Sequence, residues 1–373
     1  MTRPLPTAYW NYIRVEQLLG LQQGTAKSDR DLGDDEVRFI VIHQIDELWF
    51  KVVLRELAAA RDLFAPQHVS DDAVAAAVQR LRRVTICFEL ATQNFRLMET
   101  MSTQDYLTFR DKLHPASGFQ SAQMREIEIL LGLADDQRLP LGNETSYFDA
   151  LRNADGSDST ALLQVRARQR DLPTLKQAVD TWLHRTPIDG SQPDDPNDAA
   201  VVERFVERYL SGHATLHDRA IEHAVAMQVQ GAGDEEALRR RYGAQLAAAQ
   251  RHMRAEDVED PKRRAFVRRL RAAILFVDSN RRLPLLSWPG QVIDTLVECE
   301  QAMLIFRQRH ARMVERVIGR RIGTGGSDGV AYLDETALRY RVFTEIWSAR
   351  TLLLPPDLAP DVEDADWYGL RHD

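Results

Sequence analysis

Residues 34–63 read DDEVRFIVIHQIDELWFKVVLRELAAARDL. Apolar side chains recur at helical spacing through this stretch, and they predict one long helix. The same spacing predicts helical structure over 8–22, 71–99, 102–110, 119–133, 197–256, 289–318 and 334–353. No run of residues alternates convincingly between apolar and polar, as a half-buried strand does. The sequence therefore predicts an all-α protein.

Local signals place several helix ends. Ser102 followed by Asp105 resembles a capping box, and it predicts that a short helix begins there. Pro289 is expected at the first position of the helix that ends at Gly319. The polar stretch 153–159 and the proline-containing stretch 186–198 are expected to be connections.

Composition limits the functional classes. The chain has 373 residues, 48 basic and 56 acidic, and a net charge of −8, which argues against nucleic acid as its main partner. The arginine-rich stretch 251–282 is interpreted as a solvated amphipathic helix, with Arg264, Arg268 and Arg271 on its polar face. No secretory signal or membrane-spanning segment is expected, and two lone cysteines, Cys87 and Cys299, fit a cytoplasmic location.

Two segments of the N-terminal third carry candidate chemistry. On a helix, Phe39 and His43 lie four residues apart and share a face, so His43 could look into an apolar cavity. The alternative is a core histidine bonded to a backbone carbonyl. Tyr106 and Arg110 share the same spacing, and a guanidinium can grip a carboxylate with two parallel hydrogen bonds. The alternative is a surface arginine paired with Asp105 or Asp111.

Two further segments lie near the C-terminus. GTGGSDG, residues 323–329, has four glycines that allow close backbone approach to an anionic ligand, although a flexible linker is the alternative. His310 lies on an apolar stripe, where an imidazole is more often part of the core but can also hold a haem iron. His213 and His217 lie four residues apart without further nameable ligands, so zinc or non-haem iron is weakly supported.

In combination, these segments resemble the tryptophan 2,3-dioxygenase family. Four motifs occur in the family's order: the tyrosine-rich stretch 9–23, DDEVRFIVIHQIDELWFK at 34–51, FRDKLHPASGFQSAQMREIE at 109–128, and RHARMVERVIGRRIGTGGSDGVAYL at 309–333. The resemblance covers both ends of the chain, whereas about 134–290 is matched poorly. It implies a nearly all-α haem b protein, a homotetramer, that opens the indole ring of L-tryptophan with O2 to give N-formylkynurenine in tryptophan catabolism.

The resemblance also implies roles for single residues. His310 becomes the proximal iron ligand, and His43 becomes the distal histidine that accepts a hydrogen bond from the indole N–H. The substrate would contact Phe39, Tyr106, Arg110 and Thr324, and the haem would lie by Ser117, Gly118 and Gly325. Tyr9 and Tyr12 would complete the pocket of a neighbouring subunit.

The expected architecture follows from this assignment. Residues 1–133 and 289–353 form a helical bundle enclosing the haem, 134–288 form a helical insertion with connections, and 354–373 form a loose acidic tail. The chain departs from the family pattern at Asp34-Asp35-Glu36, at Ser327-Asp328-Gly329, and at Phe306, where a Trp is usual. Two alternatives stay open: a haem monooxygenase acting on an indole or phenol amino acid, and a non-catalytic haem-binding module.

Overall fold

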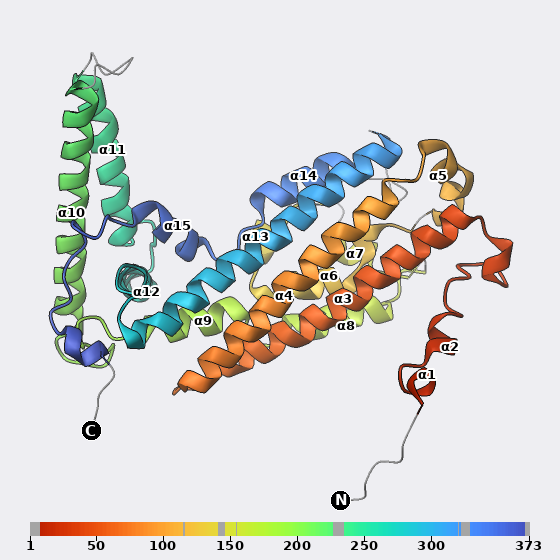
Figure 1. The fold of residues 1–373 in the computed structure, drawn as a ribbon, viewed down its shortest axis with the longest axis horizontal. Coiled ribbons are helices and arrows are strands. Elements are labelled where there is room, and N and C mark those ends of the chain that lie inside the picture. The colour runs from red at the N-terminus through yellow and green to blue at the C-terminus, as the bar shows by residue number, and fades with distance from the viewer. Residues whose placement is uncertain are drawn as a thin grey trace, which may run out of the picture. The chain divides into compact units, whose positions relative to one another are not determined.

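The computed structural model describes residues 8–114, 116–140, 146–153, 155–226, 235–319, 321 and 329–369, without the side chains of Phe119 and Tyr147. These residues form fifteen α-helices, five short 3-10 helices and no β-strand. The predicted all-α class is therefore confirmed for this part of the chain (Figure 1).

The helices have the following bounds. The α-helices are α1 (Tyr9–Tyr12), α2 (Val15–Leu18), α3 (Asp34–Phe64), α4 (Asp71–Met98), α5 (Thr103–Phe109), α6 (Ala122–Leu131), α7 (Tyr147–Ala150), α8 (Thr160–Gln169), α9 (Leu175–His184), α10 (Asp198–Ala226), α11 (Glu235–Met253), α12 (Pro261–Ser279), α13 (Pro284–Ile318), α14 (Gly329–Arg339) and α15 (Thr344–Leu352). The 3-10 helices are η1 (Asp29–Asp31), η2 (Arg110–Leu113), η3 (Gly118–Gln120), η4 (Asp135–Gln137) and η5 (Ala365–Tyr368).

The chain divides into two compact units. Unit 1 comprises Met1–Arg55, Val84–Arg170 and Gln301–Tyr340, and unit 2 comprises Glu56–Arg83, Asp171–Glu300 and Arg341–Asp373. The long helices α3, α4 and α13 each contribute residues to both units. The division into a haem-binding core, an insertion and a tail stays a prediction.

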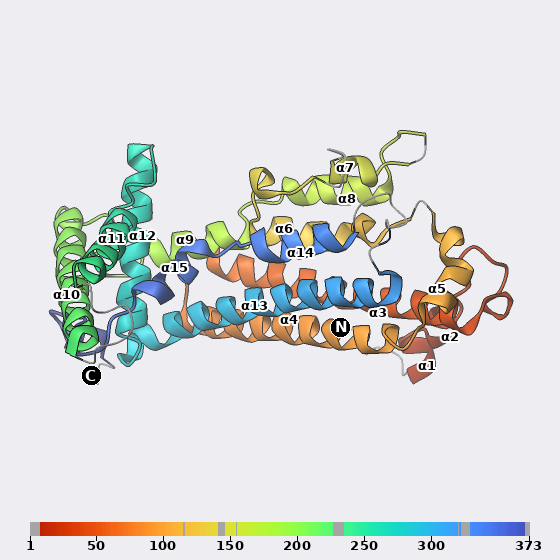
Figure 2. The same cartoon turned by 90° about the horizontal axis from the view of Figure 1, so that it is seen from above.

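Aromatic side chains form the centre of unit 1. Its segments of α3, α4 and α13 lie side by side (Figures 1 and 2), and each contributes to a cluster of buried phenylalanines. The ring centroid of Phe306 lies 5.8 Å from that of Phe50, 5.8 Å from that of Phe88 and 5.2 Å from that of Phe95. Each buried phenylalanine contributes about 1.5–3 kcal/mol to folding, so this cluster holds the three helices in place.

A smaller apolar cluster in unit 1 fixes α6 against α8 and α14. Its buried members are Ile129 from α6, Leu162 and Val165 from α8, Tyr332 from α14, and Leu151. Helix α6 ends where Gly132 adopts φ +113°, a left-handed conformation that glycine tolerates without steric cost.

Unit 2 is built from α9, α10, α11, α12 and α15 with the adjoining ends of the long helices. Arg269 of α12 donates to both carboxylate oxygens of Asp198, at 2.8 and 3.1 Å, and thereby ties α12 to the start of α10. The hydroxyl of Tyr368 donates to the carbonyl of Pro187 at 3.0 Å and accepts from the amide of Gly190 at 2.9 Å. Tyr368 is buried, so the predicted loose tail is packed at this point.

Several predicted helix bounds are wrong. The single helix expected over 8–22 is the short pair α1 and α2, separated at Arg14, which has φ +55°. Neither helix buries a residue, so no packing favours a continuous helix there. Helix α13 begins at Pro284, and Pro289 lies inside it. The helix expected over 334–353 is α14 and α15, which are separate.

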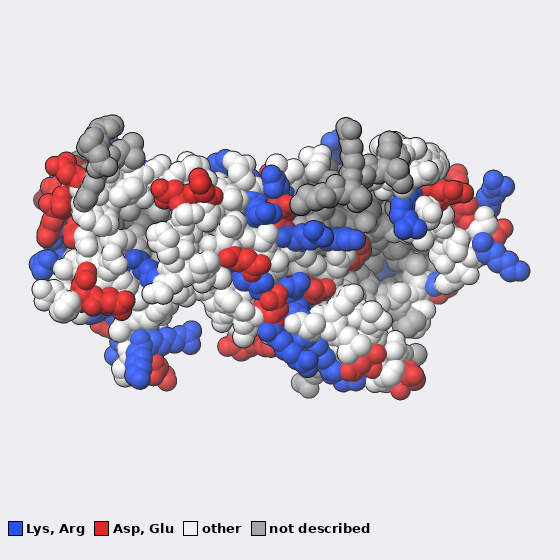
Figure 3. All heavy atoms as spheres, turned by 90° about the horizontal axis from the view of Figure 1, so that it is seen from below, with Lys and Arg blue, Asp and Glu red and all other residues white. Residues whose placement is uncertain are grey.

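The arginine-rich stretch is largely neutralised by acidic partners. Arg268 of α12 pairs with Glu203 at 2.7 Å, and Arg271 pairs with Asp257 and Glu345, both at 2.6 Å. Arg271 is buried, so the prediction that it faces solvent is wrong, because two carboxylates compensate its charge inside the unit. On the face drawn in Figure 3, acidic and basic side chains occur in neighbouring small groups.

Two further findings concern possible membranes and metals. Among the described residues no helix has the length and apolar character needed to span a bilayer. The same residues contain no group of three or more potential metal-ligating histidine, cysteine, aspartate and glutamate side chains. The ring of His213 instead bonds through Nε2 to the carbonyl of Leu352 at 2.8 Å.

Candidate active site

The predicted face of α3 is present in unit 1. Phe39 and His43 lie one helical turn apart, with ring centroids separated by 4.1 Å. Phe39 also lies near two rings of α5, with its centroid 6.3 Å from that of Tyr106 and 5.6 Å from that of Phe109. The structure thus brings Phe39 close to both His43 and Tyr106.

A backbone hydrogen bond fixes the tautomer of His43. Its Nδ1 lies 2.7 Å from the carbonyl oxygen of Phe39, which can only accept, so Nδ1 carries the hydrogen. Burial lowers the pKa of His43 below its ordinary value of 6.5, so the ring is neutral at pH 7. A neutral ring protonated at Nδ1 has a lone pair at Nε2, and Nε2 is therefore a hydrogen-bond acceptor.

Helix α5 positions the second pair of predicted residues. The capping box is confirmed: the amide of Asp105 donates to Ser102 Oγ at 3.1 Å, and the amide of Ser102 donates to Asp105 Oδ2 at 3.3 Å. Tyr106 is buried, and burial raises its pKa although the guanidinium of Arg110 opposes this. Tyr106 therefore stays a neutral hydrogen-bond donor beside a cationic guanidinium.

His310 lies on α13, with its ring stacked on that of Phe95. The two centroids are 5.2 Å apart and the planes are inclined by 11°. Burial first, and then His43 and Arg307, lower the pKa of His310 to about 4. The two predicted histidines, 267 positions apart in the chain, therefore lie within electrostatic reach of each other in unit 1.

Of the remaining predicted residues, four are described by their local contacts or exposure, and two lie outside the described residues. The amide of Ser117 donates to Gln120 Oε1 at 3.1 Å, and Gly118 begins η3. Tyr9 and Tyr12 are 75% and 77% exposed. Thr324 and Gly325 lie outside the described residues, as does the rest of the glycine-rich segment up to Asp328.

Sequence reasoning did not single out two buried carboxylates of unit 1. Asp46, three residues after His43 on α3, accepts a hydrogen bond from Asn94 at 2.9 Å, and burial raises its pKa to about 7. Glu128 of α6 lies among three arginines. The sequence could have indicated Asp46, because it is an acidic residue within the apolar stretch 39–50. Glu128 could not be found in this way, because its partners depend on tertiary packing.

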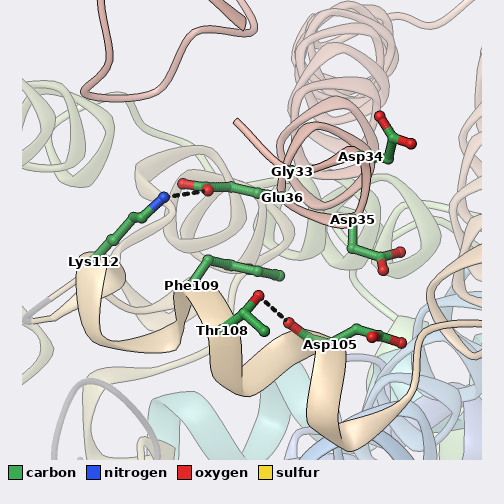
Figure 4. Close-up of a pocket in the computed structure, with 8 residues that line it drawn as sticks. All are labelled: Gly33, Asp34, Asp35, Glu36, Asp105, Thr108, Phe109 and Lys112. Carbon is green, nitrogen blue, oxygen red and sulfur yellow. Dashed lines mark hydrogen bonds and ion pairs between the residues drawn. The ribbon is translucent and has the colours of Figure 1, made fainter. Parts of the chain in front are cut away.

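A cavity of about 330 Å³ lies at the start of α3 (Figure 4). Three carboxylates, Asp34, Asp35 and Asp105, line it, and Glu36 pairs there with Lys112 at 2.7 Å. Phe109 lines this cavity and also contacts Phe39. Because the lining carries an excess of negative charge, a substrate carboxylate is disfavoured in this cavity.

The sequence that carries these aromatic and imidazole side chains matches a known protein family. Residues 4–353 match the sequence model described as tryptophan 2,3-dioxygenase. The chain belongs to the tryptophan 2,3-dioxygenase family. The resemblance noted from the four motifs is confirmed, and the chain is accordingly an oxidoreductase. The match also runs through residues 134–290, so the expectation that the family pattern covers this region poorly is wrong.

Individual relatives agree with the family match. The chain is 52% identical to tryptophan 2,3-dioxygenase of Sorangium cellulosum over 97% of this chain and 87% of that protein. It is 48% identical to tryptophan 2,3-dioxygenase 2 of Ralstonia nicotianae over 99% of both. It is 33% identical to tryptophan 2,3-dioxygenase B of Danio rerio over 95% of this chain.

Proposed function

We propose that this chain opens the indole ring of L-tryptophan, or of a substituted tryptophan, with O2 to give N-formylkynurenine, using haem b. Family membership supports the reaction. The structural observation that carries the proposal is the group in unit 1 in which the Phe39 ring lies 4.1 Å from that of His43 and 6.3 Å from that of Tyr106, measured between centroids.

The residues around His310 fit a haem ligand. An iron ligand must offer a neutral imidazole nitrogen, and the lowered pKa of His310 keeps its ring neutral at pH 7. Among the described residues no hydrogen bond engages its ring nitrogens, and its neighbours Phe95 and Phe306 provide apolar surroundings. His310 would hold the iron; when bound, haem would supply the redox chemistry by which O2 reacts with the indole.

His43 has the correct protonation state for orienting an indole. Its Nε2 accepts a hydrogen bond, and the indole N–H only donates. Phe39, which lies against His43, would pack on the indole ring. Because the indole N–H is a very weak acid, the proposed role of His43 is to orient the ring and to hold its N–H proton in a hydrogen bond.

Arg110 and Tyr106 would bind the amino-acid end of the substrate. A guanidinium and a neutral phenol together offer several donors to a carboxylate, and the fork of a guanidinium matches two carboxylate oxygens. Burial around Tyr106 excludes water and strengthens these bonds. From the family, Thr324 is expected to contact the substrate as well, and Ser117, Gly118 and Gly325 to lie by the haem.

The N-terminal segment supports the proposed homotetramer. Tyr9, Tyr12 and Leu19 are exposed by 75%, 77% and 62%, which leaves large apolar surfaces uncovered in one chain. We propose that Tyr9 and Tyr12 cover a neighbouring subunit's pocket, as in the family. A cytoplasmic location is also proposed, and it fits the two cysteines, Cys87 and Cys299, which are both buried and share no disulfide bond.

The test is reduction of the haem-loaded protein without air, followed by tryptophan and isotopically labelled O2. Formation of N-formylkynurenine with two labelled atoms is expected; one labelled atom would instead indicate the monooxygenase, and no turnover would indicate a non-catalytic haem protein. His310→Ala should abolish stoichiometric haem binding, whereas His68→Ala, at an exposed histidine of unit 2, should leave it unchanged. Retained haem binding in His310→Ala would contradict the ligand assignment.

A further inference from the structure

Three arginine side chains surround the carboxylate of Glu128 in unit 1. Arg125 Nη1 lies 2.9 Å from Oε2, Arg138 Nη1 lies 2.5 Å from Oε2, and Arg307 Nη2 lies 2.6 Å from Oε1. The side chain of Glu128 is completely buried. Burial opposes ionisation, but the three guanidinium groups outweigh it and lower the pKa of Glu128 to about 2. The carboxylate is therefore ionised at neutral pH.

This cluster carries more positive than negative charge. The side chains of Arg125, Arg138 and Arg307 are all buried, with 5–8% exposed. Arg138 also pairs with Asp135 at 3.1 Å, but the Asp135 side chain is 68% exposed. Arg307 also lies 4.9 Å from the ring centroid of Tyr340, a cation–π contact that accommodates a buried cation. The three arginines and Glu128 thus form a cluster with an excess of buried positive charge.

The cluster lies beside the predicted iron ligand. Arg307 precedes His310 by three residues on α13, and side chains three positions apart on a helix are neighbours. The carboxylate of Glu128 and the ring of Tyr340 hold the guanidinium in a single position.

We propose that the positive charge of Arg307, held in place by Glu128, raises the reduction potential of the haem bound at His310. This inference rests on the proposed function. Reduction of the iron adds one negative charge, so a fixed positive charge nearby stabilises the ferrous state, the state that reacts with O2. The effect is large because the charge is buried and weakly screened.

The test is the midpoint potential of the haem-loaded protein, measured by spectroelectrochemistry. A unit charge about 10 Å away, at an effective dielectric constant of about 20, changes the equilibrium constant for one-electron reduction by more than about tenfold. Arg307→Gln is therefore expected to lower the potential by about 59 mV or more. Arg307→Lys keeps the charge and should retain most of the potential. Arg312→Gln, which removes a half-exposed charge from the same helix, should change it little.

Glu128→Gln separates an electrostatic role from a structural one. Loss of the buried negative charge should raise the potential, whereas loss of Arg307 should lower it, and general damage to the fold would not produce opposite signs. If Arg307→Gln fails to fold, Glu128→Gln is compared with the double variant Glu128→Gln/Arg307→Gln, in which the carboxylate and one of its guanidinium partners are removed together. The double variant should have the lower potential.

The outcomes distinguish this inference from the proposed function. Shifts of opposite sign for the two substitutions support it. Equal potentials in all variants, or shifts of the same sign, overturn it while the proposed function stands if the parent protein still turns over tryptophan. A parent protein that binds no haem would overturn both.

Discussion

The substitution Asp46→Asn should stabilise the protein in a pH-dependent way. Asp46 is 8% exposed, and its carboxylate accepts a hydrogen bond from Asn94 at 2.9 Å. Burial raises its pKa from 3.8 to about 7, and the neighbouring Glu47 adds to the effect, although the bond from Asn94 opposes it. The folded protein therefore holds this proton at pH values where the unfolded chain has released it.

The magnitude follows from the shift of about three pKa units. At about 1.36 kcal/mol per unit, ionised Asp46 costs the folded state about 4 kcal/mol. Below about pH 4 both states are protonated and the cost is absent. As the pH rises toward 7 the unfolded state binds fewer protons than the folded state, so wild-type stability falls, and above pH 7 the full cost applies. Asparagine cannot ionise and avoids this cost.

Urea denaturation at equal haem content, from about pH 4 to about pH 8, measures the free energy of unfolding of Asp46→Asn and of wild type. The stability of Asp46→Asn relative to wild type should rise by about 4 kcal/mol over this range. Asp136→Asn, at an exposed aspartate, is the matched control and should follow wild type within about 0.5 kcal/mol. Parallel stability curves for Asp46→Asn and wild type would refute the assignment of a buried, protonated Asp46.

Three other substitutions test the site and the packing. Arg110→Ala should raise the KM for tryptophan by about 10- to 100-fold but hardly affect an indole without a carboxylate; equal effects on both substrates would argue against the carboxylate contact. Phe306→Ala should lower the free energy of unfolding by about 3–5 kcal/mol, because it opens a cavity among three buried phenylalanines; a loss below about 1 kcal/mol would contradict this packing. Gly212→Ala should lower Tm, because the added Cβ would lie 2.4 Å from the carbonyl oxygen of Leu358; Gly243→Ala, with open space around it, should leave Tm unchanged or raise it, and equal responses would contradict the close approach.

Local patterns predicted much of the helical structure. The extents of α3 and α4, the capping box that begins α5, and the end of α13 before Gly319 all follow from spacing and cap residues. The predicted helix bounds were wrong where packing against other parts of the protein decides them. Tyr9 and Tyr12 carry a helical pattern, but nothing in one chain buries that face, and the helix breaks at Arg14.

The helical neighbours among the candidate residues were also predictable. Phe39 and His43, like Tyr106 and Arg110, are four residues apart, and a helix brings such pairs together whatever surrounds it. Family membership followed from four motifs in order, because motifs are a property of the chain itself. The middle of the chain, which those motifs did not reach, needed comparison of the whole sequence.

Tertiary structure alone decided which distant groups meet and what charge they carry. His43 and His310 come within electrostatic reach, and Glu128 meets Arg307, only because α3, α6 and α13 pack in one unit. Packing within unit 1 buries Asp46, and packing within unit 2 buries Arg271; the sequence left both as ordinary charged residues. Helical spacing is set by backbone hydrogen bonds within a few residues, whereas ionisation depends on how much water and which charges the folded chain leaves around each group.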